Sequence, residues 1–209
     1  MIDKKIYLII TPYFPSKFSH VGSYVYDQAK EINENNHFFV KVIKLVSIFS
    51  QEEDYIFNNI SVKIFRIIDL PFFILPGLFN SFNSLRIRKF LKAKGFLNNL
   101  QIVHAHVCYP AAYLANAIKD IYPVKTIVQN HGIDALQLLN GRIDLIKSIQ
   151  YNFIRKRSIK QLNKIDLVVS VSKRVQKELH LFKNYFPKKE YILYNGVNRK
   201  KFYNLKIVK

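Results

Sequence analysis

Short apolar runs alternate regularly along the chain with longer segments that have helical spacing. Most runs are continuously apolar and rich in Ile, Val, Phe and Tyr, which is typical of strands covered on both faces. The predicted strands are residues 6–11, 39–46, 62–68, 102–106, 126–129, 167–171 and 191–194. The predicted helices are residues 23–35, about 78–94, 110–121, about 144–163 and 173–182. This order predicts an α/β fold with a doubly wound, mostly parallel, Rossmann-like sheet.

The length of the chain and its cysteine content limit the number of domains and the possible disulfides. With 209 residues, 49% of them apolar, it can bury a substantial core, and we expect one domain over residues 1–196, followed at 197–209 by the start of a linker. Cys108 is the only cysteine, so no intramolecular disulfide can form, and a reducing compartment such as the cytoplasm is the economical interpretation. The first apolar run is too short for a secretory signal, and none approaches the ~20 residues of a spanning helix.

The charge balance indicates anionic partners. The chain has 33 Lys and Arg against 14 Asp and Glu, a formal net charge of +19. Nucleic acid, anionic lipid headgroups and diphosphate substrates all fit such a positive surface, and charge alone does not separate them. A basic surface that only aids solubility is the structural alternative.

In open α/β sheets the ligand crevice lies beyond the carboxyl ends of the strands. The first strand runs into "TPYFPSKFSHVGSYVYDQA", where Gly22 would let the backbone approach a ligand and Ser23 would cap the next helix. A helix N-terminus of this kind is a natural phosphate site. Because the segment is not G-x-G-x-x-G, an ordinary strand-to-helix turn explains it equally well.

The fourth predicted strand, "QIVHAHVCYP", contains two histidines. A period of two places His104, His106 and Cys108 on one face. Zinc requires tetrahedral ligands, which one strand supplies poorly, so we expect no metal and instead a histidine pair that lies partly in the core and partly in the cleft.

The fifth predicted strand ends abruptly in the polar "VQNHGID". His131 at the strand end, Gly132 to turn the chain and Asp134 to orient or cap form a plausible hydrogen-bonding device for a polyol or a developing charge. The alternative is a histidine satisfied within its loop. The sixth strand ends in "SVSK", which places Ser172 and Lys173 at the start of the following helix.

Five segments in order resemble the N-terminal domain of glycosyltransferase family 4, the retaining GT-B enzymes. They are "TPYFPSKFSHVGSYVYDQAKEI", "QIVHAHVCYPAAYLA", "IVQNHGIDAL", "DLVVSVSKRVQKEL" and "YILYNGVNRKKF". The resemblance covers essentially the whole chain and implies that it is one half of a GT-B glycosyltransferase.

The resemblance also implies roles for residues on the donor side. The amide of Gly22 would approach the donor diphosphate, with Ser172 and Lys173 nearby, and His131 would hydrogen-bond the sugar being transferred. His131 is the candidate catalytic residue in this sense of contacting the reacting sugar, without a general-base role. Val21 stands where the family commonly has the first glycine of a pair.

On the acceptor side, the resemblance assigns contact or support to His106, Tyr109 and Asp134. The implied reaction moves a sugar from a nucleotide-sugar donor to a glycan or lipid-linked acceptor with retention and without a metal or cofactor. Family members carry a donor-binding C-terminal domain with a characteristic pair of glutamates, which this sequence lacks. We therefore expect an incomplete enzyme: either the sequence is truncated, or a separate domain or chain supplies the donor half.

Two alternatives come from other functional classes. A nucleic-acid-binding protein is suggested by the net charge and by the clusters "RIRKFLKAK" and "RKRSIK", although none of the usual docking motifs occurs. A non-catalytic acceptor-binding subunit is the second alternative.

A further predicted partner is an anionic membrane surface, which would place the protein at the cytoplasmic face of a membrane. Residues 69–96 join aromatic side chains to a basic helix. Against this, Phe82, Arg86 and Phe90 share one helical face, so the aromatic rings could instead pack on the sheet.

Overall fold

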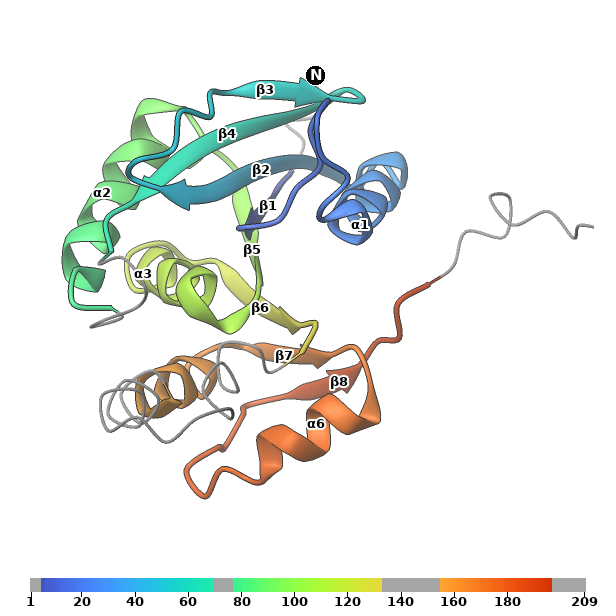
Figure 1. Cartoon of the computed structure of the whole chain (residues 1–209), viewed down its shortest axis with the longest axis vertical. Helices are drawn as coiled ribbons and strands as arrows, with labels where there is room; N and C mark the ends of the chain where they lie inside the picture. Colours follow the sequence, from blue (N-terminus) through green and yellow to red (C-terminus); the bar gives the residue numbers. More distant parts are fainter. Residues whose placement is uncertain (1–4, 70–76, 133–154, 197–209) are drawn as a thin grey trace, which may run out of the picture.

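The computed structural model describes residues 5–69, 77–132 and 155–196, and its centre is one eight-stranded sheet (Figure 1). The strands are β1 Lys5–Thr11, β2 Phe38–Ser47, β3 Tyr55–Phe57, β4 Ile60–Ile67, β5 Leu100–His106, β6 Lys125–Asn130, β7 Leu167–Ser170 and β8 Glu190–Ile192. Their order across the sheet is β3-β4-β2-β1-β5-β6-β7-β8, and all neighbouring pairs are parallel except β3 with β4. The predicted doubly wound, mostly parallel α/β fold is confirmed.

All seven predicted strands are present, and β3 is an addition that the periodicity did not predict. It pairs antiparallel with β4 through a two-residue turn at Asn58 and Asn59, which have φ of 44° and 67°. Positive φ at both central residues is the geometry that a tight hairpin requires, and asparagine tolerates it. The Asn58-Asn59 pair was therefore the feature of the sequence that could have predicted this hairpin.

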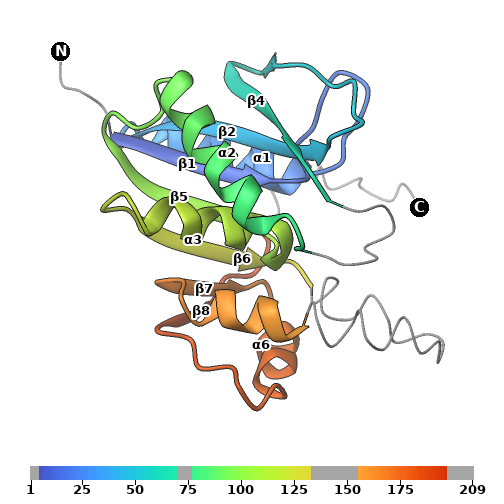
Figure 2. The same ribbon diagram turned by 90° about the vertical axis from the view of Figure 1, so that its left-hand side faces the viewer.

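Helices cover both faces of the sheet. They are α1 Ser23–Glu34, α2 Asn80–Ala93, α3 Tyr113–Lys119, α6 Lys173–His180 and the helical residues 155–162. Helix α1 lies on one face, whereas α2, α3 and the 155–162 helix lie on the other (Figures 1 and 2). The predicted helix 110–121 begins instead with an irregular π-type segment, η2 Cys108–Ala112, which contains a cis Tyr109-Pro110 bond. The first part of the predicted helix 144–163 lies outside the described residues.

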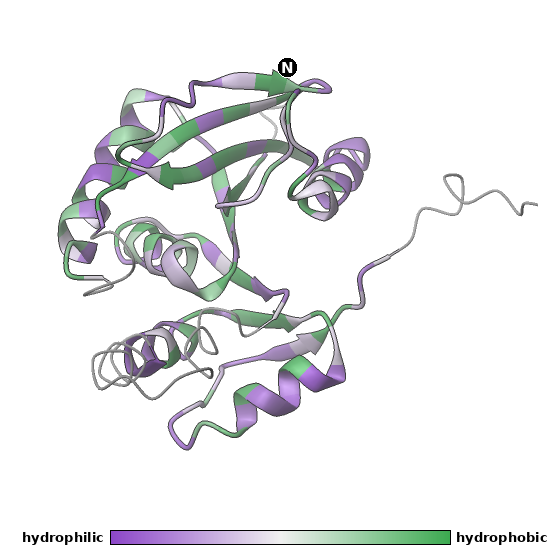
Figure 3. Cartoon of the chain, viewed as in Figure 1, coloured by the Kyte–Doolittle hydropathy of each residue, from purple (hydrophilic) through white to green (hydrophobic). Residues whose placement is uncertain are grey.

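The core is divided between the two faces. The larger cluster, under α2 and α3, includes Leu8, Ile10, Val103 and Ala105, and the smaller one, under α1, includes Tyr7, Ile9 and Val42; the strands carry most of the hydrophobic colour in Figure 3. Complete burial of a side chain such as Leu8 or Ile10 contributes roughly 1.5–3 kcal/mol. Adjacent residues of β1 belong to clusters on opposite faces of the sheet. The sheet is therefore covered on both faces, as the continuous apolar runs predict.

Candidate functional site

The strand order creates a switch point at β1. From β1 the chain moves to β2 and β4 on one side, and it later returns to β5 on the other side. The loops that leave β1 and β5 therefore run in opposite directions at the carboxyl edge, which is where open α/β sheets bind ligands. The segments that follow β1, β5 and β6 are the ones that can form a site here.

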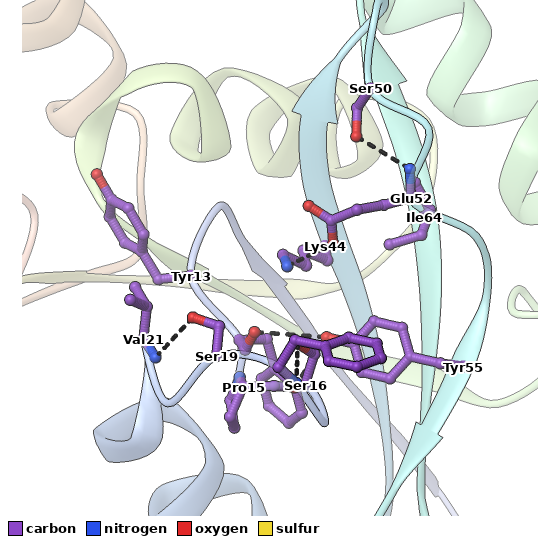
Figure 4. Close-up of polar contacts among 12 residues, drawn as sticks. Tyr13, Pro15, Ser16, Ser19, Val21, Lys44, Ser50, Glu52, Tyr55 and Ile64 are labelled. Atoms are coloured by element: carbon purple, nitrogen blue, oxygen red, sulfur yellow. Dashed lines mark hydrogen bonds and ion pairs between the residues drawn. The ribbon is translucent and has the colours of Figure 1, made fainter.

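The loop from β1 to α1 is fixed by backbone and side-chain contacts. The Ser16 N–H donates to the Ser19 carbonyl at 2.8 Å, and the Tyr55 hydroxyl donates to the Pro15 carbonyl at 2.9 Å (Figure 4). The side chains of Phe18 and Val21 remain exposed, Phe18 by 98%. The loop is thus an anchored element that presents apolar side chains at the carboxyl edge.

Gly22 is required by the geometry of this loop. It has φ of 87°, and a Cβ atom there would lie 2.5 Å from the carbonyl carbon of Tyr13. Gly22, rather than Ser23, is the N-cap of α1, and the Ser23 hydroxyl donates to the His20 carbonyl at 2.6 Å. The expected cap at Ser23 is therefore wrong, because the left-handed turn at Gly22 starts the helix one residue earlier. A diphosphate contact by the Gly22 amide stays a prediction.

Two buried histidines occupy the end of β5. The rings of His104 and His106 stack with centroids 4.4 Å apart, and the Tyr7 hydroxyl lies 2.8 Å from His104 Nδ1. The alternation of side chains along the strand predicts that these two histidines lie on the same face of the sheet, and this is confirmed. Both side chains are almost completely buried, with 2% and 0% exposure.

Cys108 does not share the face of the two histidines. Val107 has φ of 77° and ψ of 149°, a backbone region that β-branched residues rarely occupy and that costs about 1–3 kcal/mol. This conformation breaks the alternation of the strand, so Cys108 joins the cluster that contains Val103 and Ala105. The prediction of three like-facing side chains is wrong for Cys108. The strained turn lies directly beside His106.

His131 connects three elements at the carboxyl edge. It follows β6, its Nε2 lies 2.9 Å from His106 Nδ1, and its ring packs against Tyr24 of α1 with centroids 4.2 Å apart. The His106 and His131 rings are nearly parallel, with an interplanar angle of 11°. Both histidines were predicted from the sequence, but Tyr24 and Tyr7 were not, because only the fold brings them close to the histidines.

Burial keeps this histidine cluster uncharged at neutral pH. Loss of hydration lowers the pKa of His131 to about 4 and that of His104, with the charge of His131 as a second cause, to about 3. Burial, followed by the effects of His104 and His131, also holds the pKa of His106 well below its usual value. Neutral imidazoles each offer one donor and one acceptor, which suits hydroxyl groups better than phosphate charges.

Several buried polar atoms at this edge have no hydrogen-bond partner among the described residues. They are Nε2 of His106, Nδ1 of His131, Oε1 of Gln129 and Nδ2 of Asn130, all at or near the ends of β5 and β6. Buried polar atoms are normally paired, so a group of unpaired ones at a switch point indicates a place for a polar ligand or water.

The profile of Glycosyltransferase Family 4 matches residues 21–201. The chain belongs to this family. No curated protein sequence matches it. The match confirms the resemblance drawn from the five strand-end segments.

Solved structures with the same fold are GT-B glycosyltransferases. Sucrose-phosphate synthase from Thermosynechococcus elongatus is 10% identical with a TM-score of 0.66, and the match covers 96% of this chain and 50% of that one. The Escherichia coli trehalose-6-phosphate structure bound with UDP-2-fluoro glucose is 12% identical, with a TM-score of 0.52 and coverage of 94% and 50%. UDP-glucose:anthocyanidin 3-O-glucosyltransferase in complex with UDP is 13% identical, with a TM-score of 0.53 and coverage of 98% and 55%. The family member described here thus spans about half the length of these proteins.

The remaining predicted site residues of this family member have different surroundings. The Ser172 hydroxyl accepts from the Val175 N–H at 3.2 Å and so caps α6, and Lys173 is exposed beside it at the helix start. Tyr109 is buried, and its hydroxyl donates to Asp69. Asp134 lies outside the described residues. Their roles toward donor and acceptor stay predictions.

No group of three His, Cys, Asp or Glu within residues 5–69, 77–132 and 155–196 is arranged to hold a metal ion.

Proposed function

We propose that this chain forms the acceptor-side half of a retaining glycosyltransferase. In this proposal the complete enzyme transfers a sugar from a nucleotide-sugar donor to a glycan or lipid-linked acceptor, and a separate domain or chain supplies the donor-binding half. The family match over residues 21–201 supports this division, as does the coverage of half of the sucrose-phosphate synthase and trehalose-6-phosphate structures described above.

The observation that carries the proposal is the position of His131. Its ring is held between His106 and Tyr24 at the switch point, and its Nδ1 has no partner among the described residues. A neutral imidazole fixed in this way can hydrogen-bond a hydroxyl of the transferred sugar without the penalty of a buried charge. His131 therefore positions and stabilises the sugar as charge develops, rather than acting as a nucleophile.

Binding to the isolated chain tests this role directly. Panels of nucleotide sugars and of oligosaccharides would be screened by saturation-transfer NMR, and the best ligand titrated against the parent and His131→Ala. We expect at least a tenfold weaker binding in the variant, about 1.4 kcal/mol. His37→Ala is the matched control, because His37 is exposed just before β2, at the opposite edge of the sheet. Equal affinity of parent and His131→Ala for every ligand that binds would refute the assignment.

We further propose that α2 contacts an anionic membrane from the cytoplasmic side. No helix in the described part of the chain has the length and apolarity to span a bilayer. Phe82 and Leu85 of α2 are 51% and 56% exposed, and Leu78, in the turn before the helix, is 53% exposed. Lys89 and Lys92 continue the face of Phe82 and Leu85 in steps of three and four residues.

The aromatic side chains of this segment divide between the sheet and the surface. Phe90 packs on Phe65 of β4 with ring centroids 5.4 Å apart, so this aromatic ring contacts the sheet and not a membrane. In contrast, half of the Phe82 side chain is exposed. An exposed apolar stripe continued by two lysines matches the interface of a bilayer with anionic headgroups, where each lysine contributes about 1 kcal/mol.

Vesicle flotation tests the membrane contact. We expect the parent chain to float with anionic vesicles and less with neutral ones, and we expect Phe82→Ser/Leu85→Ser and Lys89→Glu/Lys92→Glu each to lower recovery. Phe186→Ser is the control, since Phe186 is 71% exposed outside α2. High salt should weaken the contact, because it screens charge. The same recovery with neutral and anionic vesicles would contradict the proposal.

A further inference from the structure

The hydrogen bond between His106 and His131 couples the two rings chemically. His106 Nδ1 lies 2.9 Å from His131 Nε2, and the outer nitrogens, Nε2 of His106 and Nδ1 of His131, have no partner among the described residues. A neutral imidazole carries one N–H, so only one of the two facing nitrogens can hold the hydrogen that they share. The other must accept it.

This requirement permits only two arrangements. If His106 donates from Nδ1, His131 accepts at Nε2 and therefore carries its own hydrogen on Nδ1. If His131 donates from Nε2, His106 accepts at Nδ1 and carries its hydrogen on Nε2. In both arrangements the two residues have the same tautomer, and a change in one requires a change in the other.

The surroundings of His106 restrict its ring. It stacks on His104, whose Nδ1 lies 2.8 Å from the Tyr7 hydroxyl, and the strained Val107 follows it with its N–H bonded to the Gln129 carbonyl at 3.1 Å. Burial raises the pKa of Tyr7 well above its usual value, so its hydroxyl retains the proton that it can donate to His104. His106 is therefore held from its own strand and from β6.

We propose that His106 is a positioning residue that sets the tautomer of His131, and thereby decides whether Nδ1 of His131 donates to or accepts from a bound hydroxyl group. His106 itself is completely buried and does not need to touch the ligand. The identity of that ligand as a sugar rests on the proposed function, but the tautomer coupling does not. A simple packing role for His106 would leave the tautomer of His131 independent of it.

Long-range ¹H–¹⁵N NMR correlations of the imidazole rings measure the tautomers directly in the ¹⁵N-labelled chain at pH 7.5. We expect His106 and His131 to show the same tautomer, both Nδ1–H or both Nε2–H. His131→Gln and His106→Asn identify the signals. Opposite tautomers in the parent chain would overturn the proposal, whatever the variants do.

Variants at His106 separate positioning from packing. His106→Phe keeps a flat ring against His104 but removes the nitrogen that faces His131, so we expect His131 to change from one tautomer to a mixture. His106→Asn keeps a polar atom near the position of Nδ1 and should restore one dominant tautomer. An unchanged His131 spectrum in folded His106→Phe would also overturn the proposal.

The experiment needs no sugar, so its outcome is independent of the ligand titration of His131→Ala. If His106→Phe does not fold, the comparison of the two tautomers in the parent still decides the question. Equal tautomers with no sugar binding would support the coupling and reject the proposed function. The reverse result would reject only the coupling.

Discussion

The two edges of the sheet differ in how their buried and partly buried polar groups are paired. At the amino ends of the strands, Asp166 accepts from the Thr126 N–H at 2.9 Å and from its hydroxyl at 3.0 Å, and it pairs with Lys119. Glu190, the first residue of β8, accepts from the Tyr185 hydroxyl and lies 2.7 Å from His180 Nε2. These polar groups are satisfied within the chain.

At the carboxyl edge, polar atoms are buried without such partners. His106, His131, Gln129 and Asn130 each have one among the described residues. The free energy lost by leaving a buried donor or acceptor unpaired is about 1–3 kcal/mol, so an edge that tolerates several is not optimised for stability alone. The amino edge therefore maintains the fold, whereas the carboxyl edge retains hydrogen-bonding capacity for a ligand.

The largest expected effect compares glycines at the two edges. Gly22→Ala would place a Cβ atom 2.5 Å from the Tyr13 backbone at φ of 87°, whereas at Gly95, which has φ of 65°, nothing lies within 4 Å of the added atom. We expect Gly22→Ala to lower the free energy of unfolding by about 3 kcal/mol or more, and Gly95→Ala by about 1 kcal/mol. Urea denaturation measures both values. Similar losses would show that the approach of Gly22 to Tyr13 is not restrictive.

The second prediction concerns a satisfied carboxylate at the amino edge. Burial alone would raise the pKa of Asp166, but the hydrogen bonds from Lys119 and Thr126 outweigh it and lower the pKa to about 2. Asp166→Ala should lower the free energy of unfolding by about 1–3 kcal/mol at pH 7, because it also leaves the buried Thr126 N–H unpaired.

The pH dependence of Asp166 follows from its lowered pKa. The folded state binds its proton more weakly than the unfolded state, so the stabilisation is complete above about pH 4 and is lost as the pH falls toward 2. The stability difference between the parent and Asp166→Asn should therefore shrink over this range. A difference that does not vary with pH would indicate that the carboxylate charge is unimportant.

The third prediction uses the neutral histidines of the carboxyl edge. The pKa of His104 is about 3 in the fold, below its usual value near 6.5, so between these values the unfolded state binds more protons. The free energy of unfolding should fall by about 1.6 kcal/mol between pH 6.5 and 5 through His104 alone. His104→Asn, which keeps an acceptor for Tyr7, should reduce this dependence. Urea denaturation of the parent and the variant at the two pH values provides the measurement.

The smallest expected change in stability comes from removing a tyrosine hydroxyl, and it should be larger for a buried hydroxyl than for a half-buried one. Tyr7→Phe removes the hydroxyl that lies 2.8 Å from His104 Nδ1, and Tyr55→Phe removes the one that donates to Pro15 at 2.9 Å. We expect a loss of about 1 kcal/mol for Tyr7→Phe and less for Tyr55→Phe, because water can reach the groups near Tyr55. Thermal or urea unfolding would measure the difference, and a larger loss at Tyr55 would contradict it.

Strand prediction succeeded because continuous apolar runs record burial on both faces. It was least accurate where the backbone leaves the regular pattern. Val107 adopts a positive φ, which a valine in the sequence does not predict. The face predicted for Cys108 was wrong for that reason. The N-cap of α1 was mispredicted for a similar reason: the sequence predicts Ser23, but the left-handed backbone at Gly22 makes Gly22 the N-cap. Local conformations of this kind depend on neighbouring elements.

The parallel α/β class, the glycosyltransferase family and the strand ends that carry His106, Gly22 and His131 could all be predicted from the amino-acid sequence. These features follow from apolar periodicity and from short motifs, which act along the chain. The contacts between side chains at the site came from the fold: His106 and His131 share a hydrogen bond, Tyr24 packs on His131, and Tyr7 lies beside His104. Those contacts join separate strands and a helix at one edge of the sheet, and such long-range pairings depend on strand order and backbone conformation rather than on the spacing of residues along the chain.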